Sequence, residues 1–448
     1  MTVLTPSQRG RTRARDKDIA SPRQPRRLGT PRSLGAELTL NDALEDPVTC
    51  TPAYFVAVHV RGFEKSSACM MMQLGWTKAA LTLFLMRRCG GFSPRRTTRF
   101  NKEARLATKR KLSAVPLSEQ LKDTLVSVKQ CADMVNEQRE EMLSSVVFID
   151  GSWYHKPDPT TNKMRNPAEE FKVGPRMPQS KYLDIDAIAC SNDLFPELNP
   201  KDLPHMMPPE RWFALAMDAY GISNEQHIIV YARRGALFAP RVWFLFLSMG
   251  HDPNKIHVMQ GSIEDYIEQG GPVEEGWLPE AIGQTEYAKC FDSGILNVTQ
   301  LHIEHYHEST TPQYIAREAT HICGKEAVRQ AVEGDGTVIL DTRSSGYKKY
   351  GHMPGSLHLP YSKIASEGNA LVVNSESALK ELFVTRNVDY LDANQKIILS
   401  CGSGVSVCHG FLALKLLGRE ITEENTFIYD ASWAEWGQED DLPKILPG

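Results

Sequence analysis

The sequence predicts an α/β protein in which two similar domains, each a mainly parallel sheet flanked by helices, follow a disordered basic leader. Three observations lead to this prediction. From about residue 146 onward, short apolar runs alternate with helical segments, which is typical of parallel α/β layers. Four short motifs of the first half recur in the same order in the second half. The charge is also divided, because residues 1–111 hold 22 Lys and Arg against 8 Asp and Glu, whereas residues 112–448 hold 29 against 47.

Length and composition restrict the class of protein. The chain has 448 residues, of which 41% are hydrophobic, and this length suits two to four domains of roughly 100–200 residues each. No uncharged apolar run approaches the roughly 18 residues that span a bilayer, so we expect a soluble protein without a membrane partner. The nine cysteines include no CxxC pair, which argues against a disulfide framework and a structural zinc site. We therefore expect a reducing compartment and no bound metal.

The basic leader covers residues 1–111 and is predicted to be disordered, because its first part is rich in Arg, Pro and Ser without helical periodicity. Its last part, residues 70–111, holds 11 Lys and Arg and a single acid, and several of its apolar residues share one helical face. That composition is typical of an organellar transit peptide and predicts a mitochondrial location, with plastid and cytoplasm as alternatives. The competing interpretation is a basic tail that touches nucleic acid or a membrane surface, but we expect no nucleic-acid partner.

The two domains and their linker follow the leader. The first domain covers residues 140–274, the linker 275–312 and the second domain 313–444. Short apolar runs predict strands, and longer segments with helical periodicity predict helices. In the first domain the expected strands are 146–150, 228–231 and 256–259, and the expected helices are 210–220 and 239–249. In the second domain the expected strands are 338–341, 396–400 and 426–429, and the expected helices are 375–383 and 405–417.

An internal duplication accounts for this shared pattern. Phe148-Ile-Asp-Gly-Ser152 corresponds to Ile339-Leu-Asp-Thr-Arg343, and Val258-Met-Gln-Gly-Ser262 corresponds to Ile428-Tyr-Asp-Ala-Ser432. Each repeat is far longer than the roughly 20–50 residues of a solenoid unit. The sequence therefore predicts two copies of one α/β fold rather than an array of small repeats.

The segment Cys401-Gly-Ser-Gly-Val-Ser406 carries the candidate chemistry. An apolar strand delivers Cys401 to a tight turn, and a helix begins directly after the turn. Gly402 and Gly404 allow positive φ values and let backbone amides point inward. We expect these amides and the helix N-terminus to form an anion cradle that stabilises a thiolate or a persulfide on Cys401. The cradle residues are Gly402, Ser403, Gly404, Val405 and Ser406. The alternative is a small buried cysteine whose glycines serve only packing.

Several motifs, in order, resemble the 3-mercaptopyruvate sulfurtransferases of the rhodanese superfamily. Cys401-Gly-Ser-Gly-Val-Ser406 resembles their active loop, and Asp341-Thr-Arg343 resembles their Asp-x-Arg element. Gly351-His-Met-Pro-Gly-Ser356 resembles the Gly-His-x-Pro-Gly-Ala element, and Asp150-Gly-Ser-Trp-Tyr154 is similar to the N-terminal half of tandem enzymes. The resemblance covers about residues 140–440. It implies a tandem rhodanese fold in which the first domain is catalytically inactive and the second is catalytic.

The same resemblance implies a sulfurtransferase reaction. The Cys401 thiolate takes sulfur from a small donor, becomes a persulfide, and passes the outer sulfur to thioredoxin, another small thiol or cyanide. Ser403 is implied to assist proton transfer, and the alternative for it is a small loop residue. We expect no cofactor and a monomer. A function of another class also stays open, namely a non-catalytic double rhodanese module that binds a partner or senses redox state.

Residues near the active loop indicate the donor. Thiosulfate-preferring relatives carry Arg or Lys just after the cysteine, whereas Gly402 and Ser403 favour 3-mercaptopyruvate here, with thiosulfate as the alternative donor. Mercaptopyruvate enzymes of the family hold the donor carboxylate with two arginines, but Tyr347 stands at the first of these positions and the second has no counterpart. The candidate substrate-binding residues are therefore Arg343, Lys348 and Lys349. For Arg343, a structural ion pair is the favoured interpretation.

The first domain lacks a nucleophile, because Ala232-Arg-Arg-Gly235 stands where the second domain has Cys401. We expect it to cover one side of the active-site cleft. Arg233 and Arg234 are interpreted as solvated surface charges rather than anion ligands. Arg176 replaces the histidine of the family's His-x-Pro-Gly-Ala element, which predicts that any Ser-His-Asp relay between the domains is weakened.

Histidines outside the active loop are interpreted as structural. His302, His305 and His307 cluster in the linker at a spacing that a metal can use. No acidic or cysteine framework accompanies them in the sequence, so a solvated linker is favoured over a metal site. His352 is interpreted as a capping or packing residue of the second domain rather than a base.

Overall fold

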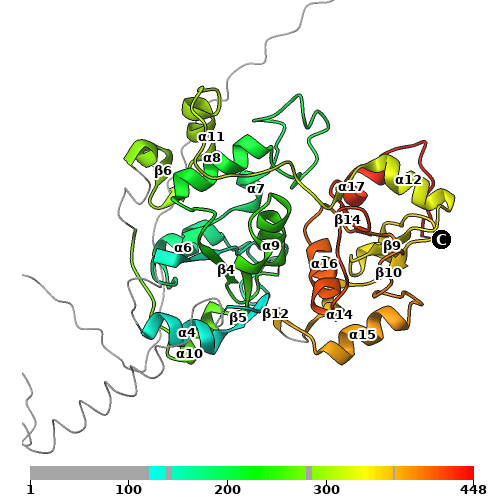
Figure 1. Cartoon of the computed structure of the whole chain (residues 1–448), viewed down its shortest axis with the longest axis horizontal. Coiled ribbons are helices and arrows are strands. Elements are labelled where there is room, and N and C mark those ends of the chain that lie inside the picture. The colour runs from blue at the N-terminus through cyan, green and yellow to red at the C-terminus, as the bar shows by residue number, and fades with distance from the viewer. Residues whose placement is uncertain (1–120, 138–143, 238, 279–284, 367–368, 448) are drawn as a thin grey trace, which may run out of the picture. The chain divides into compact units, whose positions relative to one another are not determined.

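The computed structural model describes residues 121–137, 144–237, 239–278, 285–366 and 369–447 (Figure 1). All of these residues belong to one unit of the chain, which begins at residue 94. The predicted basic leader, with its transit-peptide-like segment, lies outside the described residues. Within the described part of the chain, no helix combines the length and the apolar character that a membrane crossing requires.

Two five-stranded sheets, each with all strands parallel, form the centres of the two domains. The first sheet has the order β1-β5-β4-β2-β3. Its strands are β1 (Leu125–Ser127), β2 (Val146–Asp150), β3 (Lys181–Tyr182), β4 (His227–Ala232) and β5 (Ile256–Ser262). The second sheet has the order β8-β14-β13-β9-β10. Its strands are β8 (Ile322–Cys323), β9 (Val338–Asp341), β10 (Leu357–His358), β13 (Ile397–Ser400) and β14 (Thr426–Tyr429).

The two sheets have the same topology. When the strands are numbered within each domain in chain order, both sheets read 1-5-4-2-3. This confirms the predicted fold class of two tandem α/β domains. The strands predicted at 146–150, 338–341 and 426–429 are β2, β9 and β14. The edge strands β1, β3, β8 and β10 were not predicted, because they have only two or three residues and are too short to produce a periodic pattern.

Helices cover both faces of the first sheet. They are α4 (Val128–Asn136), α6 (Pro167–Val173), α7 (Ile185–Ile188), α8 (Glu210–Tyr220), α9 (Ala239–Ser248) and α10 (Ile263–Glu268). Along β2, Val147 and Ile149 lie in the apolar cluster of α8 and α9, whereas Val146 and Phe148 lie in that of α4 and α10. Because both faces are buried, the strand is a nearly continuous apolar run, which makes it recognisable in the sequence.

The second sheet is covered in the same way. Its helices are α12 (Lys325–Glu333), α13 (Gly346–Lys349), α14 (Tyr361–Ile364), α15 (Glu376–Val384), α16 (Val407–Leu416) and α17 (Ser432–Trp436). Leu340 and Leu399 lie in the apolar cluster of α15 and α16, whereas Ile339 and Ile398 lie in that of α12 and α17. A short antiparallel pair, β11 (Ala365–Ser366) and β12 (Asn369–Val373), connects α14 to α15.

The linker predicted at 275–312 has secondary structure where the structure describes it. Its elements are η2, a 3-10 helix (Thr285–Cys290), β6 (Phe291–Asp292), β7 (Ile295–Leu296), α11 (Val298–Leu301) and η3, a π-helical turn (His302–Tyr306). The turn η3 packs on α8, where the rings of His302 and Tyr306 lie 5.7 and 6.1 Å from that of Trp212. The expectation of a solvated linker is therefore wrong for this segment.

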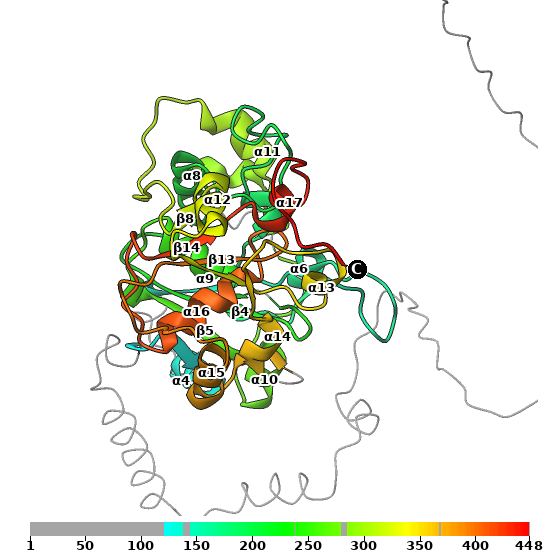
Figure 2. The same cartoon turned by 90° about the vertical axis from the view of Figure 1, so that its right-hand side faces the viewer.

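The two domains pack through α9 and α16 (Figure 1 and Figure 2). One apolar cluster continues from the α8–α9 face of the first sheet to the α15–α16 face of the second. Within it, the ring of Phe411 on α16 meets that of Phe244 edge to face with centroids 4.9 Å apart, and lies 6.3 Å from Trp243. All three side chains are fully buried. The contact between the domains is therefore built like the core of a domain.

Phe411→Ala is expected to lower the free energy of unfolding by about 3–5 kcal/mol, because it removes buried apolar surface and leaves a cavity between the two helices. The measurement is urea unfolding followed by intrinsic fluorescence. Val384→Ala is the control, since that side chain on α15 is 63% exposed, and it is expected to change the value by less than ~0.5 kcal/mol. Equal losses in the two variants would contradict this description of the contact.

Candidate active site

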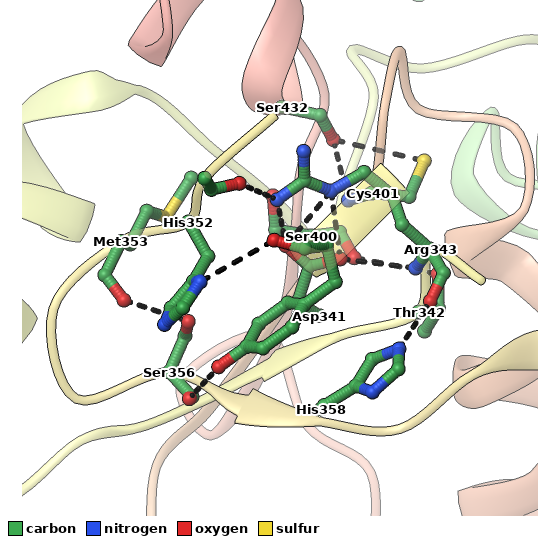
Figure 3. Close-up of polar contacts among 12 residues, drawn as sticks. Asp341, Thr342, Arg343, His352, Met353, Ser356, His358, Ser400, Cys401 and Ser432 are labelled. Carbon is green, nitrogen blue, oxygen red and sulfur yellow. Dashed lines mark hydrogen bonds and ion pairs between the residues drawn. The ribbon is translucent and has the colours of Figure 1, made fainter. Parts of the chain in front are cut away.

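Cys401 lies at the carboxyl end of β13, the middle strand of the second sheet, and is 2% exposed. Its amide donates to Oγ of Ser432 at 3.0 Å. Oγ of Ser432 donates to the carbonyl oxygen of Tyr429 at 2.7 Å. The same oxygen lies 3.9 Å from Sγ of Cys401 (Figure 3). The neighbouring parallel strands β13 and β14 therefore bring the thiol and its serine contact to the same edge of the sheet, where α/β proteins place their sites.

The turn after Cys401 requires glycine at position 404. The φ of Gly404 is +78°, and a Cβ atom there would stand 2.6 Å from the carbonyl oxygen of Asp430. Gly402 differs, because a Cβ atom at this position would meet no atom within 4 Å. Gly404 is therefore fixed by its left-handed backbone and by the close approach of Asp430, whereas the space beside Gly402 is open.

The amides of the predicted cradle are available to an anion. No described residue accepts a hydrogen bond from the backbone N–H of these loop residues, which are Gly402, Ser403, Gly404, Val405 and Ser406. Helix α16 begins directly after them at Val407, and its N-terminus adds positive potential to the loop. The arrangement suits a thiolate or persulfide anion on Cys401. Anion binding by the cradle stays a prediction.

A chain of hydrogen bonds connects this loop to the first domain. Oγ of Ser403 lies 3.0 Å from Nδ1 of His205, and Nε2 of His205 lies 2.8 Å from Oδ1 of Asp186. The indole N–H of Trp153 donates to the other carboxylate oxygen of Asp186 at 2.8 Å. This is a Ser-His-Asp arrangement assembled from both domains. The prediction that such a relay is weakened is therefore wrong.

The carboxylate of Asp186 determines where the proton of His205 lies. Burial raises the pKa of Asp186, but the hydrogen bonds from His205 and Trp153 outweigh burial and hold the pKa below its usual value. The ionised carboxylate accepts a hydrogen bond from Nε2–H of His205. In the neutral imidazole Nδ1 is then the acceptor for the hydroxyl of Ser403, the closer of two Ser403 oxygens at 3.0 and 3.2 Å. The Ser403 hydroxyl thus has a base within hydrogen-bonding distance.

The relay histidine does not come from the element in which the family resemblance places it. Arg176, which stands at that position, is buried and donates to backbone carbonyls of α6 and of Gly276. His205 lies instead in the loop before α8, with a φ of +60°. The signal that could have indicated it is a histidine between two prolines in the segment Leu203-Pro-His-Met-Met-Pro208.

Arg241, on α9 of the first domain, also reaches the loop and was not predicted. Its Nη1 donates to the carbonyl oxygen of Gly404 at 2.9 Å and lies 3.3 Å from Oδ1 of Asp430. Its Nη2 donates to the carbonyl oxygen of His205 at 2.5 Å. The other oxygen of Asp430 accepts the amide of Met207 at 2.6 Å. One buried guanidinium therefore links the active loop to the segment that carries the relay histidine.

The three candidate substrate-binding residues lie in two different environments. Arg343 is buried, with Nη2 2.7 Å from Oδ2 of Asp341 and 2.8 Å from the carbonyl oxygen of Gly351 (Figure 3). Its Nη1 makes no hydrogen bond to any residue that the structure describes. Lys348 and Lys349 are exposed on α13. A role in donor binding stays a prediction for all three.

Tyr347 stands at the position where the family resemblance implies the first donor arginine. Its ring stacks between those of His352 and His358, with centroids 3.9 and 4.4 Å away, and its hydroxyl donates to the carbonyl oxygen of Ser356 at 2.7 Å. Burial raises the pKa of Tyr347, so the residue is neutral and offers no charge to a carboxylate. The stacking agrees with the interpretation of His352 as a packing residue.

In the first domain, the loop that corresponds to the active loop contains a buried arginine, Arg233, which pairs with Asp150. Arg233 is 4% exposed, and its Nε lies 3.2 Å from Oδ2 of the fully buried Asp150. Its amide donates to Oγ of Ser152 at 2.8 Å. The interpretation of Arg233 as a solvated charge is therefore wrong, whereas Arg234 is exposed and pairs with Asp265 at 2.7 Å. Arg233 supplies to Asp150 the cation that Asp341 receives from Arg343.

Comparison with known proteins identifies relatives in both sequence and fold. The rhodanese-like domain family matches residues 325–439. The 3-mercaptopyruvate sulfurtransferase of Escherichia coli is 30% identical over 285 residues, which are 62% of this chain and 86% of the relative. The mitochondrial thiosulfate/3-mercaptopyruvate sulfurtransferase 1 of Arabidopsis thaliana is 29% identical over 314 residues, covering 66% and 73%. The thiosulfate sulfurtransferase of Gallus gallus is 25% identical over 316 residues, covering 70% and 92%.

Two crystal structures have the fold of the described domains. The 3-mercaptopyruvate sulfotransferase SseA of Escherichia coli has a TM-score of 0.50 at 23% identity and covers 70% of this chain and 99% of its own. Tum1 of Saccharomyces cerevisiae has a TM-score of 0.52 at 23% identity and covers 73% and 98%. Fold and site together define a tandem rhodanese protein. The chain belongs to the family of 3-mercaptopyruvate and thiosulfate sulfurtransferases, and is a sulfurtransferase.

Gly404→Ala is expected to lower the free energy of unfolding by at least about 1–2 kcal/mol, because alanine is strained in the left-handed conformation, and the contact with Asp430 adds to this cost. Gly402→Ala is the matched control and is expected to change stability by less than ~0.5 kcal/mol, since the space beside it is open. Urea unfolding of both variants gives the comparison. A larger loss in Gly402→Ala would show that the loop has another conformation.

Proposed function

We propose that this sulfurtransferase takes sulfur from 3-mercaptopyruvate, carries it as a persulfide on Cys401, and delivers it to thioredoxin, a small thiol or cyanide. The observation that carries the proposal is the loop in which Cys401 is followed by unpaired amides and by Ser403, whose hydroxyl lies 3.0 Å from His205. The Escherichia coli relative, a 3-mercaptopyruvate sulfurtransferase, supports the same donor.

In the first step, the thiolate of Cys401 attacks the sulfur of 3-mercaptopyruvate. A bond forms between the two sulfur atoms while the carbon–sulfur bond of the donor breaks. The electron pair of the broken bond stays on carbon as the enolate of pyruvate, and that carbon then takes up a proton. The products are pyruvate and a persulfide on Cys401, so the step consumes no external oxidant or reductant.

Ser403 and His205 provide the proton path for this step. The thiol of the donor gives up a proton as the persulfide anion forms, and the enolate requires one. A hydroxyl with a base behind it can carry a proton from the first group to the second. Asp186, 2.8 Å from His205, keeps the imidazole in the orientation that serves the hydroxyl.

In the second step, the thiolate of the acceptor attacks the outer sulfur of the persulfide. The bond between the two sulfurs breaks, and its electron pair returns to Cys401 as a thiolate. Negative charge therefore sits on sulfur beside the loop in both steps. Amides that make no other hydrogen bond stabilise such charge without having to reorganise. The two half-reactions give ping-pong kinetics.

The residues after Cys401 favour 3-mercaptopyruvate over thiosulfate. Thiosulfate is a dianion, and a cationic side chain next to the nucleophile would offset its charge at short range. Positions 402 and 403 hold Gly402 and Ser403, which carry no charge. 3-Mercaptopyruvate instead reacts through a thiol that must lose a proton, and this suits a loop with a proton relay. Thiosulfate stays the alternative donor, since relatives include thiosulfate sulfurtransferases.

The proposal is tested by steady-state kinetics of the full chain with each donor and a reduced thiol acceptor. We expect kcat/KM for 3-mercaptopyruvate to exceed that for thiosulfate by at least about tenfold. Intact-mass spectrometry without acceptor should show a gain of one sulfur atom that is absent in Cys401→Ser and present in the control Cys323→Ser. A preference for thiosulfate would contradict the donor, and no added sulfur with either donor would favour the non-catalytic module.

His205→Gln is expected to lower kcat/KM for 3-mercaptopyruvate by about 10²–10⁴-fold, because the Ser403 hydroxyl loses its base. The loss with thiosulfate should be smaller, since that donor brings no thiol proton. His155→Gln is the control, because His155 is exposed and its ring stacks on that of Trp153 with centroids 5.9 Å apart. Equal losses with both donors would mean that His205 acts by holding the loop rather than by moving a proton.

A further inference from the structure

The linker brings together a thiol, a carboxylate and an imidazole. Cys290 ends η2, and Glu304 and His305 are consecutive residues of the π-helical turn η3. One ligand atom of each residue lies within 4.8 Å of the ligand atoms of the other two. The expectation that the linker histidines lack an acidic or cysteine framework is therefore wrong for His305.

The distances are close to those of a zinc site. Sγ of Cys290 lies 3.9 Å from Oε2 of Glu304, and Nε2 of His305 lies 3.8 Å from the same oxygen. In tetrahedral zinc sites, where the metal–ligand bonds measure about 2.0–2.3 Å, neighbouring ligand atoms stand about 3.3–3.8 Å apart. The third pair, Sγ of Cys290 and Nε2 of His305, lies within 4.8 Å, so no pair has to close by more than about 1 Å to reach this spacing. Cys290 is fully buried, and the side chains of Glu304 and His305 are 34% and 17% exposed, so the cluster is shielded but reachable from solvent.

His305 has the orientation of a metal-bound histidine. Its Nε2 is buried and makes no hydrogen bond to the residues that the structure describes. Its Nδ1 lies 3.3 Å from Oε2 of Glu308, and its ring meets that of Tyr287 edge to face at 5.0 Å. A carboxylate on one nitrogen fixes the ring and makes the other nitrogen a better ligand, which is the usual outer shell of a zinc histidine.

The other two residues are also held in place. Oε1 of Glu304 accepts a hydrogen bond from the side-chain amide of Gln300, whereas Oε2 faces the thiol of Cys290, which donates to it at 3.9 Å. The carbonyl oxygen of Cys290 accepts the amide of Asn297 at 2.7 Å, which closes the β6–β7 hairpin between η2 and α11. The side chain of Asn297 in turn caps α11 by accepting the backbone N–H of Gln300 at 3.0 Å. The chain between Cys290 and Glu304 is therefore a short segment with regular hydrogen bonds, which holds the two residues near each other.

We propose that Cys290, Glu304 and His305 bind one zinc ion, with a water molecule as the fourth ligand. Sulfur, nitrogen and oxygen ligands together select zinc rather than magnesium or calcium, which take oxygen ligands only. Binding releases the thiol proton of Cys290 to solvent. The ion ties the hairpin to the π turn that packs on α8 through His302 and Trp212, so its role is structural and separate from Cys401.

The experiment measures zinc in the full chain carrying Cys401→Ser, so that the proposed nucleophile does not bind metal. The protein is loaded with zinc and dialysed against metal-free buffer. Its zinc content is then measured by inductively coupled plasma mass spectrometry. Cys290→Ser and His305→Gln should each lose about one equivalent relative to this parent. The matched controls His307→Gln, an exposed neighbour, and Cys323→Ser, a thiol of the second domain, should lose none.

Two further measurements separate zinc binding from damage to the fold. Glu308→Gln removes only the outer-shell carboxylate, and it is expected to weaken zinc binding by about 10–100-fold in competition with a chelator while circular dichroism stays unchanged. Cobalt(II) in place of zinc should give a thiolate charge-transfer band that Cys290→Ser lacks. The proposal would be overturned if the parent retained no zinc. It would also be overturned if Cys290→Ser and His305→Gln held as much zinc as the parent.

Discussion

The buried guanidinium of Arg241 is the contact on which the arrangement of the active loop depends. A charge without partners in a protein interior costs several kcal/mol, so Arg241 is stable only where its acceptors all face it. Those acceptors are Asp430 and Gly404 from the second domain and the carbonyl oxygen of His205 from the first. A shift of one domain against the other would break this set and also separate His205 from Ser403. Docking of the domains and assembly of the relay are therefore one event.

The same rule about buried charge explains how the two copies of the fold divide the work. Each domain has a buried aspartate at the end of its second strand, and each aspartate requires a cation. In the second domain Arg343, two residues later, pairs with Asp341, so the loop after β13 is left for Cys401. In the first domain the cation for Asp150 comes from Arg233, which lies in the loop itself. That loop cannot also present a nucleophile, and the first domain contributes through Arg241 and His205 instead.

Sequence patterns were informative where local chemistry decides the structure. Strand β2 is buried on both faces and is therefore an apolar run, and Gly404 is favoured by a left-handed backbone conformation in which alanine is strained. Contacts between the two domains produce no local sequence pattern. His205 is about 200 residues from Ser403 in the chain, and only the packed domains bring the two together. An arginine is usually found at the surface. Arg233 is buried because it pairs with the carboxylate of Asp150, and no local sequence pattern indicates this contact.

The burial of Cys401 limits how sulfur can leave the proposed persulfide. At 2% exposure, Cys401 offers almost no surface to a thiol on another protein, but the outer sulfur of a persulfide would stand about 2 Å from Sγ. One side of the loop is closed, because Gly404 lies against Asp430 and its carbonyl is held by Arg241. The open side is at Gly402, where even a Cβ atom would meet nothing within 4 Å. In the proposed reaction, the side at Gly402 is therefore the one left for an acceptor thiol. An arginine there would attract a dianionic donor and narrow this path, so the residue after the nucleophile bears on both the donor and the acceptor.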